Sequence, residues 1–360
     1  MFIDGRFIEN ESGKWIKVLN PSTEEVISLM PDGTVRRWNA EGLPEYMTPE
    51  WMYPPAPDRS HEICNDMMTE REYQYEKYLG FDGIIRLFFN IPWFRFAAGR
   101  PPVKTAEDWE ELKQKVVQEL ETYCTDEAIR TIYGKYAEGH KHGEYSIRFE
   151  IRGFFWTPRD LFGIEEHLMA FYEEPELMHD MNQFLLDVYL KYLDKVFDCV
   201  QPDDLYISED LSGANGPMIS PAMFDEFVGK YYRQLIPFLK KKGVRTVLVD
   251  TDGDFRLLIP NFLAAGVEGF IPLDVNAGMD IVALREEYPN LKMVGGFNKL
   301  CIAAGPEAID REFERLLSVI RQGGYVPGCD HQVAPSTSYE NYQYYIRKLK
   351  EVMMQAGADL

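Results

Sequence analysis

The stretch VLVDTDGDFRLLIPNFLAAGVEGFIPLD, residues 247–274, decides the fold class of this chain. It reads as a β-strand that ends at Asp250, a helix over 255–266, and a second strand that ends at Asp274. A short strand–helix–strand unit is typical of parallel strands joined by a helical crossover. The first strand runs into three carboxylates within five residues. Crowding of this kind is unfavourable unless the groups are protonated or bound to a cation.

The same alternation continues on both sides of this unit. No G-x-G-x-x-G motif follows the first strand and no G-x-x-x-x-G-K motif occurs, so the phosphate-binding signatures of open doubly wound sheets are missing. We therefore expect a (β/α)8 TIM barrel over 61–360, after an N-terminal extension over 1–60 with β-hairpin-like segments. The expected helices are 62–80, 105–124, 175–200, 220–243, 255–266, 280–288, 305–324 and 338–357, and the expected strands are 83–92, 145–156, 204–210, 245–250, 268–274, 292–297 and 325–331.

Composition excludes several classes of partner. The net charge of −21 argues against nucleic acids and anionic membranes, because both attract basic patches. The five cysteines are widely spaced and form no C-x-x-C motif, which argues against a disulfide framework. The opening residues show no signal peptide, and no apolar run approaches the roughly 18 residues that span a membrane. The sequence thus predicts a cytoplasmic protein.

Acidic side chains, a thiol and an imidazole follow the predicted strands. The carboxyl ends of the strands meet at one mouth of a barrel, and chemistry gathers there. Carboxylate, thiolate and imidazole groups are suitable zinc ligands. We therefore predict a zinc site drawn from Glu209, Asp250, Asp252, Cys329 and His331.

Simpler interpretations stay open for several acidic and thiol groups. Asp254 is well placed to cap the helix that follows it. Asp330 can orient His331 instead of touching the metal. Cys329 can be an inert small residue of the core.

Aromatic and basic residues supply the expected substrate site. The segments 88–96 and 154–160 would form an aromatic wall, although such clusters are more often core. Arg159 and Lys299 can pair with a carboxylate on the substrate, or serve as structural ion pairs. The expected substrate-binding residues are Phe89, Trp93, Phe155, Trp156, Arg159 and Lys299.

Residues 203–345 resemble the uroporphyrinogen decarboxylase superfamily. The segments that carry the resemblance include VDTDGD (249–254), LKMVGGFNK (291–299) and GGYVPGCDHQVAPSTSYEN (323–341). The resemblance implies a (β/α)8 barrel. The superfamily contains uroporphyrinogen decarboxylases and methyltransferases that use corrinoids. The arginine-rich opening that decarboxylases use to hold porphyrinogen carboxylates is missing here.

The departure from the family's zinc motif points to one branch. Coenzyme M methyltransferases of the family carry His-x-Cys-Gly and a later cysteine as zinc ligands. Here Asp250-Thr251-Asp252-Gly253 matches that motif, and the later cysteine falls at Cys329. Aspartates give a harder, oxygen-rich site, which suits activation of an oxygen leaving group. The segment resembles methyltransferase components of O-demethylases from anaerobic bacteria.

The resemblance implies a zinc-dependent methyltransferase. It would cleave a methyl ether, expected to be a methoxylated aromatic compound, and pass the methyl group to the cob(I)alamin of a corrinoid protein. The expected catalytic residues are Glu209, Asp330 and His331, and barrels of the family are often dimeric, so a homodimer is one expected state. The alternatives are a metal-independent decarboxylase or lyase, and a non-catalytic binding barrel.

The opening residues carry a second, shorter resemblance. DGRFIENESGKWIKVLNPSTEEVI, residues 4–27, is similar to the amino-terminal strands of aldehyde dehydrogenases. A plain β-hairpin accounts for the same residues.

Overall fold

A computed structural model gives the fold of residues 2–3, 6–7, 37–44, 64–66, 73, 77–81, 83–96, 101–331 and 333–358. The remaining residues, including most of the predicted extension over 1–60, lie outside this description. Within it, β1 (Phe2–Ile3) and β2 (Arg6–Phe7) pair as antiparallel strands. This short pairing agrees with the hairpin-like character expected at the start of the chain.

The main sheet has eight strands in the order β12-β11-β10-β9-β6-β5-β4-β3. Seven of them, all except β3, lie within the seven strands expected from the sequence. All pairs from β4 to β12 are parallel, and only β3 runs antiparallel to its neighbour. The bounds are β3 Cys64–Asp66, β4 Ile84–Phe89, β5 Ser146–Arg152, β6 Asp204–Ser208, β9 Thr246–Asp250, β10 Gly269–Ile271, β11 Lys292–Phe297 and β12 Tyr325–Cys329.

One sequence prediction needs correction here. Residues 62–80 were expected to form one helix, but 64–66 form β3, and among the rest only 73 and 77–79 are described as helical. The backbone groups on the free edge of β4 require partners, and β3 supplies them. Of the expected barrel, the described residues show a seven-stranded parallel half-barrel with β12 at one edge and the antiparallel β3 at the other, and closure of the barrel stays a prediction.

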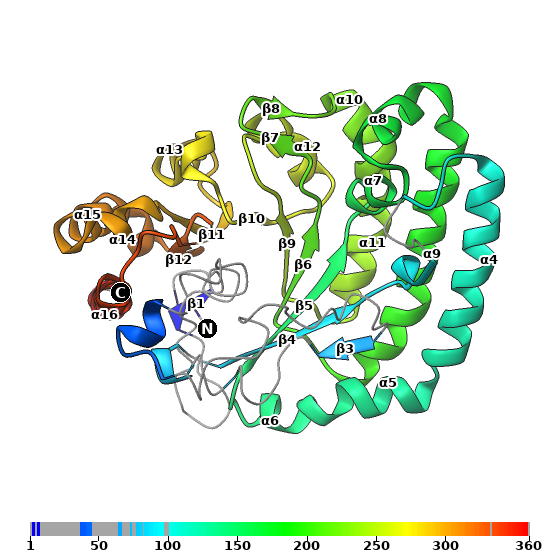
Figure 1. Cartoon of the computed structure of the whole chain (residues 1–360). Coiled ribbons are helices and arrows are strands. Elements are labelled where there is room, and N and C mark those ends of the chain that lie inside the picture. Colours follow the sequence, from blue (N-terminus) through cyan, green and yellow to red (C-terminus); the bar gives the residue numbers. More distant parts are fainter. Residues whose placement is uncertain are drawn as a thin grey trace.

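Helices cover the outer side of the sheet, with α9 and α11 outside β5 and β6 and α15 and α16 beyond β11 and β12 (Figure 1). Thr105 and Asp108 form a capping box at the start of the helix Ala106–Tyr123. The predicted helix over 220–243 is interrupted by a π-helical turn at Asp225–Gly229. The helices are α4 Ala106–Tyr123, α5 Asp126–Tyr133, α6 Ala137–Lys141, α7 Trp156–Phe162, α8 Ile164–Glu173, α9 Pro175–Cys199, α10 Pro221–Phe224, α11 Lys230–Lys241, α12 Ile259–Ala264, α13 Ile281–Glu287, α14 Leu300–Ala304, α15 Pro306–Gln322 and α16 Tyr339–Ala358.

Side chains alternate between two faces of the sheet, as the period of a strand requires. Leu205 and Val249 belong to the large core under the helices. Tyr206, Leu248, Ile271 and Val294 form a second, separate cluster on the inner face. This alternation decides which residues at the strand ends continue toward the helices and which turn toward the mouth.

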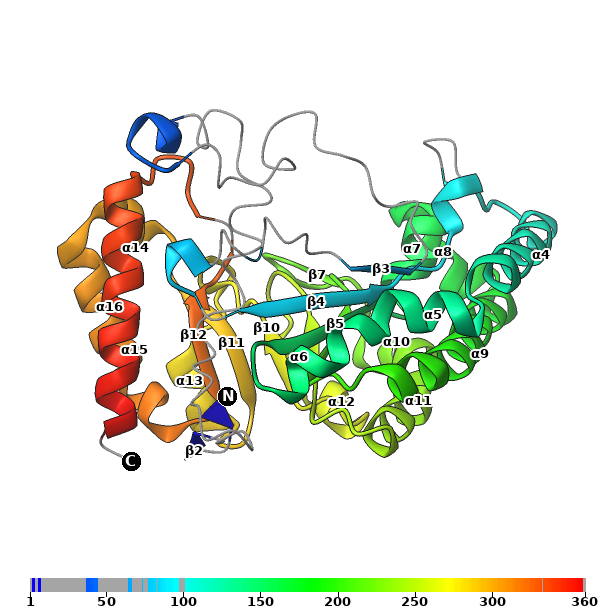
Figure 2. The same ribbon diagram turned by 90° about the horizontal axis from the view of Figure 1, so that it is seen from below.

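Part of the predicted extension lies in the core. Trp38 is almost fully buried, and its ring lies 4.8 Å from that of Tyr342 on α16. Its Nε1 donates to the carbonyl of Thr337 at 2.8 Å. Residues 37–44 lie beside α16 in both views (Figures 1 and 2). None of the described helices has the length and apolarity needed to cross a membrane.

Candidate functional site

Two of the predicted site residues meet at the carboxyl ends of the parallel strands. Nε2 of His331, just after β12, lies 3.8 Å from Oδ2 of Asp252, two residues after β9. Both side chains are partly exposed, and Nδ1 of His331 has no hydrogen-bond partner among the described residues. A carboxylate beside an imidazole can orient the ring for general acid–base chemistry.

Burial raises the pKa of Asp252, and the carboxylates of Asp210 and Asp274 raise it further. His331 and the amine of Lys299 act in the opposite direction, by favouring the charged carboxylate. These four groups come from the ends of different strands, so they identify one shared mouth. The mouth is therefore polar and mostly acidic.

The turn after β9 fixes the position of Asp252. Gly253 has φ 76°, and a Cβ there would lie 2.6 Å from the carbonyl oxygen of Gly213. That same oxygen accepts a hydrogen bond from the backbone N–H of Asp254 at 3.0 Å. The close approach admits only glycine, and it ties the turn to the loop after β6.

Asp254 serves its own loop. Its carboxylate accepts from Nε and Nη2 of Arg256 at 2.9 and 2.7 Å and from the backbone N–H of Arg256 at 3.2 Å. The pKa of Asp254 is lowered by these bonds to Arg256. Asp254 therefore makes a local turn and ion pair with Arg256, no side-chain cap is found at the start of the helix that follows, and Asp254 is not part of the Asp252–His331 pair.

Glu209 lies elsewhere than the sequence suggested. It is fully buried and continues the outward-facing positions of β6. Its carboxylate accepts from three consecutive backbone N–H groups, those of residues 154–156, at 3.0, 2.8 and 3.0 Å, and from the hydroxyl of Tyr232. Burial raises the pKa of Glu209 to about 7, although these hydrogen bonds favour the charged form. Glu209 thus anchors the start of α7 and has no free oxygen for a metal.

Cys329 also faces the helices. It is fully buried, and burial raises the pKa of its thiol to about 12, although a hydrogen bond with Tyr345 of α16 favours the thiolate. The thiol thus bonds to Tyr345 of α16, on the helix side of the sheet and not at the Asp252–His331 pair. Asp250, in contrast, ends β9 on the inner face, beside Ser208 and Ile271.

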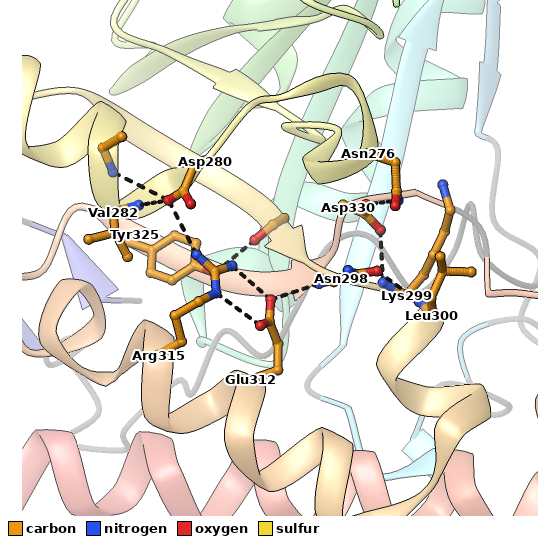
Figure 3. Close-up of polar contacts among 12 residues, drawn as sticks. Asn276, Asp280, Val282, Asn298, Lys299, Leu300, Glu312, Arg315, Tyr325 and Asp330 are labelled. Atoms are coloured by element: carbon orange, nitrogen blue, oxygen red, sulfur yellow. Dashed lines mark hydrogen bonds and ion pairs between the residues drawn. The ribbon is translucent and has the colours of Figure 1, made fainter.

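Asp330 is held below the mouth. It is fully buried, and it accepts from Nδ2 of Asn276 and from the backbone N–H of Lys299, both at 3.0 Å (Figure 3). Burial raises its pKa, and the contact with Lys299 acts against that rise. Asp330 therefore anchors the loops after β10 and β11, which differs from the expected role of orienting His331.

The zinc site expected from the sequence is not assembled. No three or more His, Cys, Asp and Glu side chains stand together to hold a metal ion in the described part of the chain. Two of the five expected ligands, Glu209 and Cys329, have other partners on the far face of the sheet. The residues present therefore do not fit a zinc ion with that ligand set.

The expected aromatic wall is largely core. Phe89, Trp93 and Phe155 are each at most 3% exposed. Phe89 stacks on Tyr192 of α9 at 5.6 Å, so this ring faces the helices. A cluster of aromatic residues in the sequence does not show on which face of the sheet each ring lies. The prediction that these three rings bind the substrate fails for that reason.

Trp156 and Arg159 form a different unit at the start of α7. Trp156 is half-buried, with the guanidinium groups of Arg152 and Arg159 at 5.1 and 4.4 Å from its ring. Nη1 of Arg159 donates to the carbonyl oxygen of Asp210 at 2.6 Å and lies 3.3 Å from its carboxylate. Asp210 has φ 42°, an uncommon conformation for a residue other than glycine, and Arg159 stabilises it.

Sequence reasoning missed Asn276 and Glu312. Asn276 donates to Asp330, and Glu312 of α15 accepts from the backbone N–H of Asn298 at 3.1 Å. Asn276 lies two residues after the predicted strand end at Asp274, but no role was assigned to it, and Glu312 lies in the middle of a helix. Only the packing of α15 and the loop after β10 against β11 brings them to the site.

Comparison with known proteins agrees with this fold. A family model described as Uroporphyrinogen decarboxylase (URO-D) matches residues 98–352. A uroporphyrinogen decarboxylase of Aliarcobacter butzleri is 22% identical over 185 residues, 51% of this chain and 51% of that protein. The chain thus spans about half the length of the curated relatives it matches. A methyltransferase from Methanosarcina mazei has a similar structure, with a TM-score of 0.51 and 15% identity over 78% of this chain and 84% of that one, which shows the fold alone.

A shorter match concerns another family. A methylmalonate-semialdehyde/malonate-semialdehyde dehydrogenase of Bos taurus is 50% identical over 40 residues, 11% of this chain and 7% of that protein. A match of that length carries no fold or activity over to this chain. The family model, which covers well over half of the sequence, does decide the family. The chain belongs to the uroporphyrinogen decarboxylase family.

Proposed function

We propose that this chain is a methyltransferase that takes a methyl group from a methyl ether, expected to be a methoxylated aromatic compound, and passes it to the cob(I)alamin of a corrinoid protein. The observation that carries the proposal is the Asp252–His331 pair at the mouth. The resemblance of residues 249–254 to O-demethylase methyltransferases and the fold shared with a methyltransferase support it.

The pair answers the chief chemical difficulty of the reaction. An aryl oxide, whose conjugate acid has a pKa of about 10 by analogy with tyrosine, is a poor leaving group. In the proposed step the Co(I) electron pair forms the cobalt–methyl bond while the carbon–oxygen bond breaks. The oxygen keeps that bond's electrons and takes a proton from the His331 imidazolium. Asp252 orients the ring, and the neutral imidazole left by the transfer regains a proton from solvent.

Zinc requires a separate test. Because Glu209 and Cys329 are committed elsewhere, we expect anaerobically purified protein to contain far less than one zinc per chain. We also expect Asp252→Ala to leave that content unchanged. Metal analysis by mass spectrometry measures both. Near-stoichiometric zinc that falls in Asp252→Ala or His331→Ala would instead support Lewis-acid activation of the ether oxygen.

The activity test uses free cob(I)alamin as the acceptor under anaerobic conditions, with a panel of methoxylated aromatic compounds. Methylcobalamin formation is followed by absorbance. We expect His331→Gln to lower the rate by about 100-fold or more and Asp252→Asn to lower it less. Asp254→Asn is the matched control, because that carboxylate pairs with Arg256 instead. Equal rates in His331→Gln and wild type would contradict the proposed role of the pair.

A metal-independent decarboxylase is the second candidate. The Asp252–His331 pair needs no metal to donate a proton, and the family model carries the name of a decarboxylase. Release of carbon dioxide from uroporphyrinogen or another carboxylate, with no methylcobalamin formed, would favour this alternative.

A further inference from the structure

The Asp252–His331 pair is not closed by a hydrogen bond of its own. The 3.8 Å between Nε2 of His331 and Oδ2 of Asp252 is longer than a hydrogen bond. The other ring nitrogen, Nδ1, is buried and has no hydrogen-bond partner among the described residues. Asp252 can orient the ring only from a fixed separation. That separation therefore depends on what holds the two loops that carry these side chains.

The loop that carries Asp252 is held from the side of β6. The N–H of Asp254 donates to the carbonyl of Gly213 at 3.0 Å. The N–H of Glu209 donates to the carbonyl of Asp250 at 2.9 Å. These bonds join the loops after β6 and β9 and do not extend to the loop after β12. The position of His331 must therefore be set by other contacts.

Asp330, the residue before His331, ties this loop to its neighbours. Its N–H donates to the carbonyl of Phe297 at 2.8 Å, and its Oδ1 accepts from the N–H of Lys299 at 3.0 Å. Its Oδ2 accepts from Nδ2 of Asn276 in the loop after β10, also at 3.0 Å. Figure 3 shows the carboxylate between Asn276 and Lys299. The backbone that leads into His331 is thus held by the loops after β10 and β11.

The loop after β10 presents Asn276 in a fixed way. Asn276 lies in the short helical turn Val275–Ala277, and its N–H donates to Oδ1 of Asp274 at 3.0 Å. The loop begins at Leu273, whose φ of 63° is uncommon for a residue other than glycine. Backbone of this kind persists where the surroundings enforce it, and it occurs often at functional sites. Asn276 is itself exposed, so burial in the core does not explain why its amide bonds to Asp330.

We infer that Asn276 is a positioning residue for His331, which it holds opposite Asp252 through the carboxylate of Asp330. Asp330 acts through the backbone that it shares with His331, and the imidazole itself is not its partner in the described contacts. A hydrogen bond to a charged carboxylate is stronger than one between neutral groups, so its loss should free the loop after β12. The inference rests on the role of His331 in the proposed function.

The first test reads the surroundings of His331 without any substrate. Diethyl pyrocarbonate is applied at about pH 8, where an imidazole with the ordinary pKa of about 6.5 is neutral and reactive. Modification of each histidine is followed by peptide mass spectrometry, with the exposed His142 as the internal reference. The proteins compared are wild type, Asn276→Ala, Asp330→Asn, the double variant of these two, and Asn261→Ala.

Asn261 provides the matched control. Its Nδ2 donates to Oδ2 of Asp225 at 2.8 Å, so Asn261→Ala removes a bond of the same kind between α12 and the π-helical turn. Its effect on the reactivity of His331 shows what the loss of such a bond does elsewhere in the protein.

We expect His331 to react about threefold or more faster in Asn276→Ala than in wild type, because freeing the loop exposes its buried Nδ1. Asp330→Asn should act in the same direction. Adding Asn276→Ala to it should change the rate little further, since both residues act through one bond. Asn261→Ala should match wild type. If Asp330→Asn does not fold, Asn276→Ala and its control decide the inference.

Three results would overturn the positioning role. They are unchanged reactivity of His331 in Asn276→Ala, additive effects of the two substitutions at the mouth, and an equal increase in Asn261→Ala. Each would show that the bond between Asn276 and Asp330 does not set the surroundings of His331.

Methyl transfer to free cob(I)alamin separates this inference from the proposed function. Asn276→Ala should lower kcat by about tenfold and leave KM within about twofold, because a displaced proton donor slows the reaction without removing a substrate contact. A raised KM with unchanged kcat would show that Asn276 binds the substrate, which would overturn the positioning role. Wild-type protein that transfers no methyl group, with the reactivity of His331 changed as expected, would contradict the proposed function alone.

Discussion

Glu209 is a buried carboxylate whose hydrogen bonds hold the start of α7. Its oxygens accept from three backbone N–H groups and from Tyr232, and a Cβ on Gly153 would lie 2.1 Å from its Cδ. The missing side chain at Gly153 is what allows this approach. Since α7 carries Trp156 and Arg159, the geometry of the mouth depends on Glu209 without Glu209 facing it.

Replacing Glu209 by Gln should destabilise the protein by about 3 kcal/mol. The amide N–H₂ group would face backbone N–H donors and leave one of them without an acceptor. Chemical denaturation measures the change, and Glu165→Gln on the exposed side of α8 is the control. Gly153→Ala should act in the same direction. A loss below about 0.5 kcal/mol in Glu209→Gln would show that the N–H groups find other acceptors.

Gly253 sets the position of Asp252. Gly253→Ala should destabilise the protein by about 1–3 kcal/mol, because its φ is 76° and the new methyl group would contact the carbonyl of Gly213. The rate of methyl transfer should fall by a larger factor than the loss of folded protein explains, because Asp252 would move. Gly213→Ala is the control, because a Cβ there meets nothing within 4 Å. Equal effects of the two substitutions on stability and rate would contradict the steric argument.

At the scale of elements, α8 carries a buried histidine. His167 is fully buried against Phe155, with ring centroids 4.8 Å apart, and neither ring nitrogen has a hydrogen-bond partner in the described structure. Burial lowers the pKa of His167 to about 3, with a smaller contribution from Arg159. The folded protein therefore binds this proton less readily than the unfolded chain does.

Stability should consequently be lost as the pH falls below about 6.5, the ordinary pKa of histidine, toward 3. Between pH 8 and pH 5, protonation of this histidine in the unfolded chain should lower the free energy of unfolding by about 2 kcal/mol. His167→Leu should reduce the pH dependence by that amount in denaturation at the two pH values. His142→Gln, at an exposed site, should not. An unchanged pH dependence in His167→Leu would show that another group governs acid sensitivity.

At the scale of the whole molecule, residues far apart in the sequence pack together beside α16. Trp38 packs on Tyr339 and Tyr342, and the N–H of Tyr339 donates to Glu41 at 2.7 Å. Residues 37–44, which fall in the predicted extension, thus place Trp38 in the core. The division of the chain at residue 60 itself stays a prediction.

Trp38→Ala should lower the free energy of unfolding by about 3–5 kcal/mol, as for other large buried aromatic residues. Tyr172→Ala, at a side chain that is 74% exposed, should change it by less than about 0.5 kcal/mol. Denaturation of both variants tests this. A small effect of Trp38→Ala would mean that residues 37–44 add little to the stability of the sheet.

The sequence by itself determined the alternation of strands and helices, because hydrophobic period and capping residues are local properties. It placed β9 to β12 and most long helices, and it showed that Asp252 and His331 follow strands. Tertiary structure decided which strand-end residues face the mouth. Glu209 and Cys329 continue the outward face and bond to the start of α7 and to α16, whereas Asp252 and His331 meet at the mouth. That choice depends on backbone N–H groups and helices distant in the sequence, and no local pattern encodes it.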